Sequence, residues 1–420
     1  MDHVRDLGAF VAASPSPFHA AAEGARRLTE AGFLHQDEQH DWDSTPGGHF
    51  IVRDGALIAW HIPDGAVATT GFRIVGSHTD SPTFKLKPRP SVGARGYSQL
   101  GVEIYGGPLL NSWLDRELGL AGRLVLPDGT STLVRTSAIM RIPQLAIHLD
   151  RSVNDDGVKL DKQQHTAPVW SVDHPELDIL AFLAEAAGAS PADVLCHDVV
   201  AFDTASPAVF GPGDEFFASA RLDNLASVHA SLVALLSAVR SNTEAIPVLA
   251  AFDHEEVGSG SRSGAAGPVL ADVLRRISYS LGASLDERHR ALARSWCLSS
   301  DTGHAVHPNY ANRHDPANQP RLNGGPLLKL NANQRYATDA RGAAEWRRCC
   351  GEAGVPTQEF VSNNNLPCGS TIGPLTATRL GITTVDVGIP LLSMHSAREL
   401  AGVQDPRLLS SAMEVFFRSG

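Results

Sequence analysis

Acidic and histidine side chains recur in five short segments, and one of them carries the strongest chemical signal. In Asp253–Ser259 (DHEEVGS), Glu255 and Glu256 follow directly after the apolar run Ile246–Phe252. Adjacent carboxylates at the end of a buried strand repel each other and lose solvation, so they need a compensating positive charge. A metal ion supplies that charge. An acidic loop facing solvent would fit the preceding apolar run less well.

A second segment places an imidazole where a metal could bind. His78 and Asp80 follow the predicted strand Phe72–Val75 through Gly76-Ser77. Histidine is a good zinc ligand, and a carboxylate nearby can bind its other ring nitrogen and fix the tautomer. Taken alone, a His-x-Asp triplet is a weak motif, and a polar loop is the more common explanation for it.

Two further carboxylates stand at element boundaries. Asp223 opens a segment whose apolar residues recur at helical spacing, where a first-turn acid is also expected without any metal. Asp301 follows the short apolar run Trp296–Leu298, and His304 comes soon after it. His304 could be a ligand, a wall of the site or a core residue.

The fifth segment contains His395. Ser396 and Glu399 have the S-x-x-E spacing of a capping box, which predicts a helix beginning just after His395. The five segments in chain order supply His, Asp, Glu-Glu, Asp and His. Such a set can hold two ions roughly 3.5–4 Å apart that share an aspartate and activate a water molecule.

The elements that must position these residues alternate between strands and helices after Gly213. Apolar strands are predicted at 246–252, 296–298 and 382–387, and a helix at 225–239. This alternation indicates an α/β sheet covered on both faces, in which ligands gather at the carboxyl ends of the strands. Earlier, Ser16, Pro17 and Gly32 predict a helix over 14–32.

A change of composition separates the middle of the chain. Prolines and glycines accumulate from Pro82 onward, and two β-like runs flank Pro127-Asp-Gly-Thr130, which is a hairpin signal. We therefore predict a strand-rich domain over 90–213, with a helix near 176–188, inserted into a catalytic domain formed by 1–89 and 214–420. A chain of 420 residues favours two domains.

Composition narrows the class of protein. The 46 acidic and 35 basic residues give a formal net charge of −11, which argues against a nucleic-acid partner. Any preference for acidic substrates must then come from a local cationic pocket. Five cysteines, an odd number without a CxxC pair, indicate a reducing compartment, so we expect a cytoplasmic protein. We expect neither a signal peptide nor a membrane span.

Six stretches are specific enough to compare with a known family. They are Ser77–Asp80, Asp253–Ser259, His304–Tyr310, Asn333–Thr338, Cys368–Pro374 and Ser393–Glu399. Together they resemble the aspartyl aminopeptidase family of di-zinc metallopeptidases, and the resemblance runs over nearly the whole chain. Other di-zinc aminopeptidases share the order of the ligands, whereas the last four stretches are typical of this family.

The resemblance implies roles for the acidic and histidine residues. Glu255 would be the general base, Asp80 would orient His78, and Asp223 would bridge two divalent ions. Zinc is the expected metal, although carboxylate and imidazole ligands also suit cobalt or manganese. The implied metal ligands are His78, Asp223, Glu256, Asp301 and His395.

The resemblance also implies a fold and an assembly. The expected fold is an α/β metallo-aminopeptidase catalytic domain with an inserted β-rich dimerisation domain. The expected assembly is a homo-oligomer, a tetrahedral dodecamer. In such an assembly His148, within the matching segment Ile142–His148, would reach a neighbouring subunit's active site. Without that role, His148 would be a strand residue in a dimer interface.

The expected substrates are peptides with a free N-terminus that begin with Asp or Glu. Lys329, His148 and His304 are the candidate substrate-binding residues. Asn363 and Asn365 depart from the family pattern, in which a basic and an acidic residue are frequent, so the sequence also allows specificity for neutral residues. Two functions of a different kind compete with this prediction: a carboxypeptidase or deacylase on a related fold, and a non-catalytic oligomeric scaffold or cargo protein.

Overall fold

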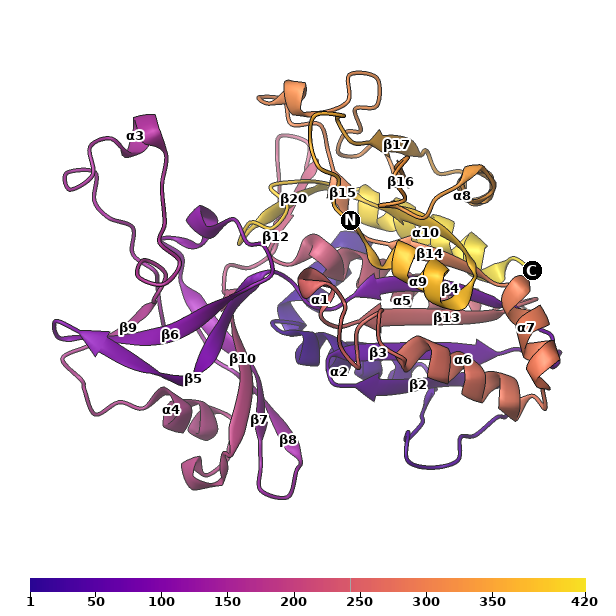
Figure 1. The fold of residues 1–420 in the computed structure, drawn as a ribbon, viewed down its shortest axis with the longest axis horizontal. Helices are drawn as coiled ribbons and strands as arrows, with labels where there is room; N and C mark the ends of the chain where they lie inside the picture. Colours follow the sequence, from indigo (N-terminus) through magenta and orange to yellow (C-terminus); the bar gives the residue numbers. More distant parts are fainter. Residues whose placement is uncertain (242) are drawn as a thin grey trace.

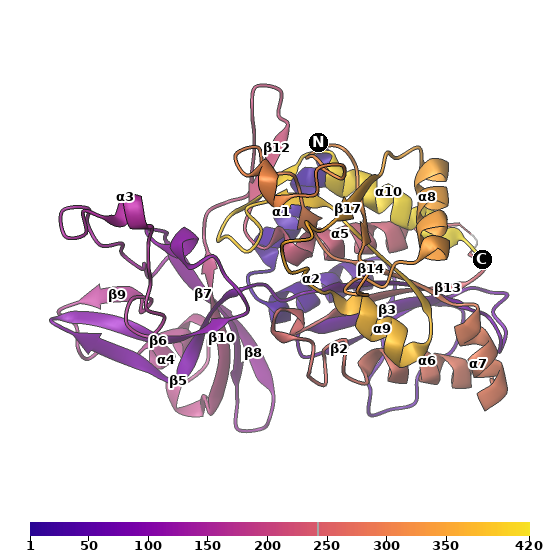
Figure 2. The ribbon, with the colours of Figure 1, turned by 45° about the horizontal axis from the view of Figure 1, so that its top comes forward.

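The computed structural model describes residues 1–241 and 243–420. Two lobes are separate in both ribbon views (Figure 1, Figure 2). The larger lobe is built on a nine-stranded sheet with the order β1-β2-β3-β13-β4-β14-β18-β16-β17. Its strands are β1 (Leu34–His35), β2 (Gly47–Arg53), β3 (Ala56–Ile62), β4 (Phe72–His78), β13 (Ile246–Phe252), β14 (Trp296–Ser300), β16 (Leu327–Leu330), β17 (Gln358–Val361) and β18 (Thr383–Gly388).

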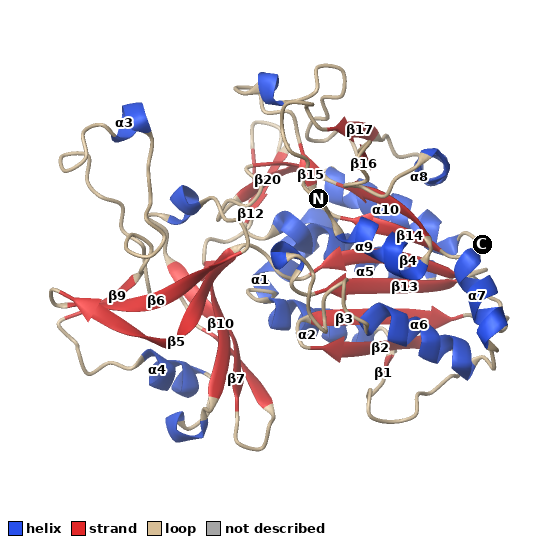
Figure 3. Ribbon diagram, in the orientation of Figure 1, coloured by secondary structure: helices blue, strands red, loops and turns tan. Residues whose placement is uncertain are grey.

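Helices cover both faces of this sheet (Figure 3). Along β13, Ile246, Val248 and Ala250 pack in one apolar core, while Leu249 and Ala251 pack in the other. This alternation is the two-residue period of a strand that is buried on both faces. One face carries α1 (Asp2–Ala13), α2 (Pro17–Glu30), α5 (Leu222–Ala238), α8 (Ala340–Ala353) and α10 (Asp405–Arg418); the other carries α6 (Val269–Ser280), α7 (Leu285–Ala293) and α9 (Ile372–Leu380).

The second lobe is a six-stranded sheet with the order β8-β7-β10-β5-β6-β9, all of whose pairings are antiparallel. It contains the predicted hairpin (β7–β8) and a helix (α4) at the predicted place near 176–188. The sheet draws on residues 83–203, a few residues earlier than the predicted limits of 90 and 213. Its elements are β5 (Thr83–Ala94), β6 (Tyr97–Tyr105), β7 (Leu118–Val125), β8 (Ser131–Arg135), α3 (Val153–Asp156), β9 (Val169–Val172), α4 (Ile179–Ala186) and β10 (Cys196–Asp203).

A five-stranded sheet lies next to the larger lobe and forms the turn that holds His395. Its order is β11-β12-β20-β19-β15. The chain returns from β19 to the antiparallel β20 through residues 393–398. The strands are β11 (Ala208–Phe210), β12 (Phe216–Ser219), β15 (Gly303–His304), β19 (Pro390–Leu392) and β20 (Glu399–Gly402).

The observed architecture confirms the predicted α/β class. The helix predicted over 14–32 is α2, with Ser16 as its N-cap and Pro17 in its first turn. Helix α1, which buries Leu7 and Phe10, was not predicted. Within the described residues, no helix combines the length and apolarity needed to cross a membrane.

Candidate metal centre

The strand ends bring most of the predicted ligands to one place. The neighbouring strands β13 and β4 run parallel, with Phe252 paired to His78, and β14 runs parallel on the other side of β4. Glu255 and Glu256 lie in the short helical turn that follows β13, and Asp301 follows β14 directly. Parallel strands end at the same edge of a sheet, which is why segments so distant in sequence meet here.

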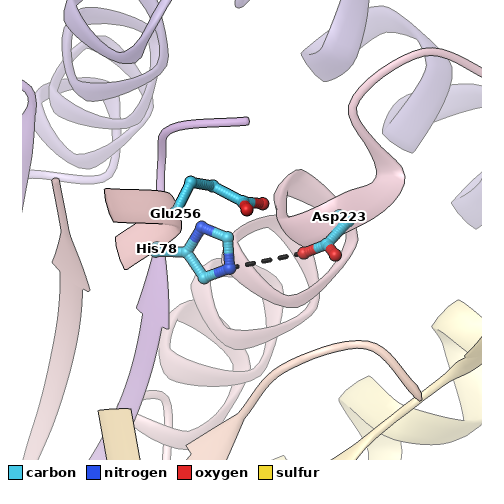
Figure 4. Close-up of side chains that lie close together, drawn as sticks. All are labelled: His78, Asp223 and Glu256. Carbon is cyan, nitrogen blue, oxygen red and sulfur yellow. Dashed lines mark ion pairs between the residues drawn. The ribbon is translucent and has the colours of Figure 1, made fainter. Parts of the chain in front are cut away.

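Asp223 lies between the two histidines. The Nε2 atom of His78 is 3.3 Å from Asp223 Oδ1 and 3.4 Å from Asp301 Oδ1. The Nε2 atom of His395 is 3.4 Å from Asp223 Oδ2 and 3.5 Å from Glu256 Oε2. Figure 4 shows His78, Asp223 and Glu256 pointing toward one another. Each oxygen of Asp223 therefore faces a different histidine.

These groups influence one another's protonation. Burial raises the pKa of Glu255 to about 7, and the charges of Asp301 and Asp223 add to the shift. Burial and Asp223 also raise the pKa of Glu256. Burial opposes a charged imidazole at His395, but Asp223 and Glu256 outweigh it and raise its pKa to about 10. Protons thus compensate part of the charge of the acidic cluster, in the way that a cation would.

The donor set fits divalent ions. Single ligand atoms of His78, Asp223 and Glu256 all lie within 4.8 Å of one another. Asp223 Oδ1 and Glu256 Oε1 are buried and have no hydrogen-bond partner among the described residues. Buried carboxylate oxygens are costly unless they are paired or bind a cation, and imidazole with carboxylate is a ligand combination suited to zinc.

Asp80 connects three parts of the centre. Its backbone carbonyl accepts a hydrogen bond from His78 Nδ1 at 3.0 Å, which leaves Nε2 of that ring facing Asp223 and Asp301. Its carboxylate accepts the backbone N–H groups of Glu255 and Glu256, both at 3.1 Å. The buried Asp80 therefore holds both His78 and the turn that carries the two glutamates.

The capping box predicted at Ser396 and Glu399 is wrong. Residues 393–398 form turns, and Glu399 begins β20. The Glu399 carboxylate is buried and accepts the backbone N–H of His395 at 2.8 Å and that of Asp223 at 2.9 Å. Burial, with Asp223 close by, raises the pKa of Glu399 to about 8. Sequence reasoning assigned this residue to a helix start and missed its contacts with Asp223 and His395.

Of the three candidate substrate-binding residues, two lie near the centre. Lys329, in β16, is almost fully buried, whereas a lysine without a special role would be expected to be exposed on its strand. Its Nζ donates to Thr302 O at 2.7 Å and lies 3.4 Å from Asp301 Oδ2. His304, on β15, packs edge-on against Phe360, and burial with the nearby charge of Lys329 lowers its pKa, whereas Asp223 acts in the opposite direction.

His148 is not brought to the centre within a single chain. It lies in an exposed segment of the six-stranded lobe, where three apolar neighbours are also exposed: Leu145 at 58%, Ile147 at 45% and Leu149 at 76%.

Sequence reasoning also missed Tyr105, whose hydroxyl donates to Asp80 Oδ2 at 2.7 Å. No motif marks Tyr105, because its contact depends on how the two lobes meet.

Comparison with known proteins gives a consistent result. The family described as aminopeptidase I zinc metalloprotease (M18) matches residues 10–417. A probable M18 family aminopeptidase 2 from Streptomyces coelicolor is 54% identical over 421 residues, covering 99% of this chain and 98% of that protein. A chain in the cryo-EM structure of the Ape4 and Nbr1 complex has a TM-score of 0.95 at 35% identity, covering 99% of this chain and 85% of that one. A chain of the S. cerevisiae mApe1 dodecamer has a TM-score of 0.87 at 28% identity, covering 99% of this chain and 96% of that one.

Proposed function

This chain belongs to the M18 family of aminopeptidases, which are zinc metalloproteases, and we propose that it uses two divalent metal ions to remove N-terminal Asp or Glu residues from peptides. The observation that carries this proposal is the position of Asp223, with one oxygen 3.3 Å from His78 and the other 3.4 Å from His395. A carboxylate placed in this way suits the role of a bridging ligand. The other proposed ligands are Glu256, Asp301 and the two histidines.

The chain's own groups supply the proton transfers. Glu255 lies beside the ligands, with Oε2 3.9 Å from His78 Nε2, where its carboxylate can accept a proton and return it. We assign it as the general base that takes a proton from the attacking water and passes it to the leaving amine. Bound ions would polarise the scissile carbonyl and lower the pKa of that water.

Specificity for acidic residues is assigned to Lys329, and His304 is a further proposed substrate-binding residue. An ammonium group has three N–H donors, and Lys329 directs its Nζ toward Thr302 O and Asp301. A remaining donor can bind the carboxylate of a substrate side chain in a charge-assisted hydrogen bond. We propose that His148 of a second copy completes this pocket in a homo-oligomer, which its exposed apolar neighbours and the dodecameric relative support.

A second specificity is favoured by one observation. The side-chain amide of Asn363 donates to Asn312 O and His314 O, so it stabilises a loop and contributes no charge at a place where the family pattern often has one. Preference for neutral N-terminal residues is therefore the competing specificity.

We also propose that the protein is located in the cytoplasm. Its five cysteines are free, which supports a reducing compartment.

Hydrolysis of Asp-, Glu-, Leu- and Ala-anilides tests the proposal, with zinc, cobalt or manganese returned after chelation. We expect metal-dependent cleavage that is fastest for Asp and Glu. Faster cleavage of Leu or Ala would keep the aminopeptidase and overturn its acidic specificity. No cleavage with any metal would favour a non-catalytic scaffold. An unchanged rate on peptides with a blocked amine would favour a carboxypeptidase or deacylase.

A further inference from the structure

A segment of the six-stranded lobe crosses to the candidate metal centre and touches it at several points. This segment, Tyr105–Ser112, begins at the end of β6 and is here named the strap. We propose that the strap positions the metal-binding residues and sets the affinity of the centre for its ions, with Tyr105 as the main positioning residue. The inference rests on the proposed metal centre and adds to it a control by the inserted lobe of the same chain.

The first contact of the strap acts on the His78 side. The Tyr105 hydroxyl donates to Asp80 Oδ2 at 2.7 Å, and the same oxygen accepts the backbone N–H of Glu256 at 3.1 Å. Asp80 in turn binds His78 and the Glu255 N–H through its other polar atoms. Tyr105 is therefore one of the donors that fix the Asp80 carboxylate, which binds the N–H groups of both glutamates and whose Oδ1 lies 3.4 Å from His78 Nδ1.

The second contact is steric and involves Glu256. Gly106 has a φ of +68°, and a Cβ added there would lie 3.1 Å from Glu256 Cβ and 3.4 Å from its carbonyl oxygen. A side chain at Gly106 would be strained by the backbone conformation and would press on a proposed ligand. The strap thus packs directly against the backbone and Cβ of Glu256.

The third set of contacts acts on the His395 side. The carbonyl of Gly107 accepts a hydrogen bond from His395 Nδ1 at 3.0 Å, and Leu109 N–H donates to His395 O at 2.9 Å. Ser112 Oγ accepts the backbone N–H of Ala397 at 2.9 Å. The bond to Gly107 fixes the ring so that Nε2 faces Asp223 and Glu256, as partners of metal-binding histidines do. Both proposed histidine ligands are thus oriented by groups on the strap, directly or through Asp80.

Metal binding by four single variants of the full-length protein tests the proposal. Tyr105→Phe removes only the hydroxyl, and Gly106→Ala adds only a methyl group. Tyr97→Phe, at the exposed start of the same strand, is the control for the first. Gly129→Ala, in the β7–β8 hairpin, is the control for the second, because its φ is +84° and the added Cβ would meet nothing within 4 Å.

The measurements are Zn²⁺ affinity by competition with a chelator, the absorption spectrum with Co²⁺, thermal unfolding without metal, and particle size. We expect Tyr105→Phe and Gly106→Ala to bind Zn²⁺ about 10- to 100-fold more weakly and to alter the Co²⁺ spectrum, since outer partners of ligands have effects of this size. The control variants should match the unmodified protein.

If Tyr105→Phe and Gly106→Ala bind Zn²⁺ as tightly as the unmodified protein, the proposed role of the strap is wrong, but the proposed metal centre is unaffected. Equal weakening in Gly129→Ala or Tyr97→Phe would also overturn it, because a general loss of stability would then explain the effect. An unmodified protein that binds no Zn²⁺ would instead overturn the proposed function, and the strap's role with it. If Tyr105→Phe folds poorly, the Zn²⁺ affinity of Gly106→Ala, compared with that of Gly129→Ala, decides whether the strap has this role.

Discussion

The candidate metal centre and the His148 segment are opposites in chemical character. In the centre, charged side chains are buried: His78 is 1% exposed, Asp223 4% and Glu399 2%. In the His148 segment, apolar side chains are exposed, with Leu149 at 76%. Buried charge and exposed apolar surface are both unfavourable for an isolated chain. Each region therefore needs a different partner. We propose that metal ions bind the centre and that a second copy of the chain covers the His148 segment.

The largest effect is expected from Glu255→Gln, which separates chemistry from metal binding within the centre. This variant keeps the size of the side chain and removes its basicity, so kcat should fall by roughly 100- to 10,000-fold. Bound metal, measured by elemental analysis, should stay at the level of the unmodified protein. Near-normal turnover with metal bound would show that another group is the general base.

The second effect concerns the exposed region. Leu149→Asp places a charge on the most exposed apolar side chain of the His148 segment, so we expect smaller particles by light scattering. Activity should fall with particle size, because His148 would no longer reach a second copy. The metal content should not change. An intact oligomer with full activity would show that this segment lies outside the interface.

Lys329→Met tests whether the cation beside the centre selects acidic substrates. A hydrogen bond to a charged group contributes about 1.5–3 kcal/mol, so the ratio of kcat/KM for Asp- over Leu-anilide should fall about 10- to 100-fold. The ratio is the informative quantity, since Lys329 also contacts Asp301 and its loss affects every substrate. A constant ratio would remove Lys329 from specificity.

The smallest effect expected is a dependence of metal-free stability on pH. The pKa values of Glu255 and Glu399 are raised to about 7 and about 8. A carboxyl group whose pKa is raised by folding stabilises the folded state below its unfolded pKa, and this contribution is lost as pH rises through the folded pKa. His78 and His395, whose pKa values are also raised, act in the same direction.

Partly buried histidines such as His3 and His19 have pKa values that burial lowers, so they oppose this trend at acidic pH but are neutral in both states above about pH 7. The melting temperature of chelated protein should therefore fall as pH rises from about 7 to about 9. Saturating zinc should reduce this dependence, because the ions replace the protons. A melting temperature that rises over this range without metal would contradict the assigned protonation of the cluster.

The sequence was most informative where a residue directly follows a strand. The runs before His78, Glu255 and Asp301 are short and apolar, and parallel strands must end at a common edge, so their convergence could be predicted. The same logic predicted the strands at 296–298 and 382–387. Local pattern was therefore sufficient for the fold class and for the grouping of the acidic and histidine segments.

Contacts between segments that are distant in the chain could not be predicted from the sequence. Glu399 has the spacing of a capping residue, yet its carboxylate binds the N–H of Asp223, 176 residues away. Tyr105 and Gly107 carry no motif, because their contacts depend on how the two lobes pack. The burial of Lys329 likewise follows from its neighbours in the sheet, and a four-residue strand pattern does not reveal it.

Titration of the chelated protein with zinc, following both bound metal and hydrolysis of Asp-anilide, tests the central claim most directly. The account predicts that activity is absent without metal and reaches its plateau at about two equivalents per chain, as a two-metal site requires. Activity that persists after complete removal of metal, or that is fully restored by a single equivalent, would contradict it.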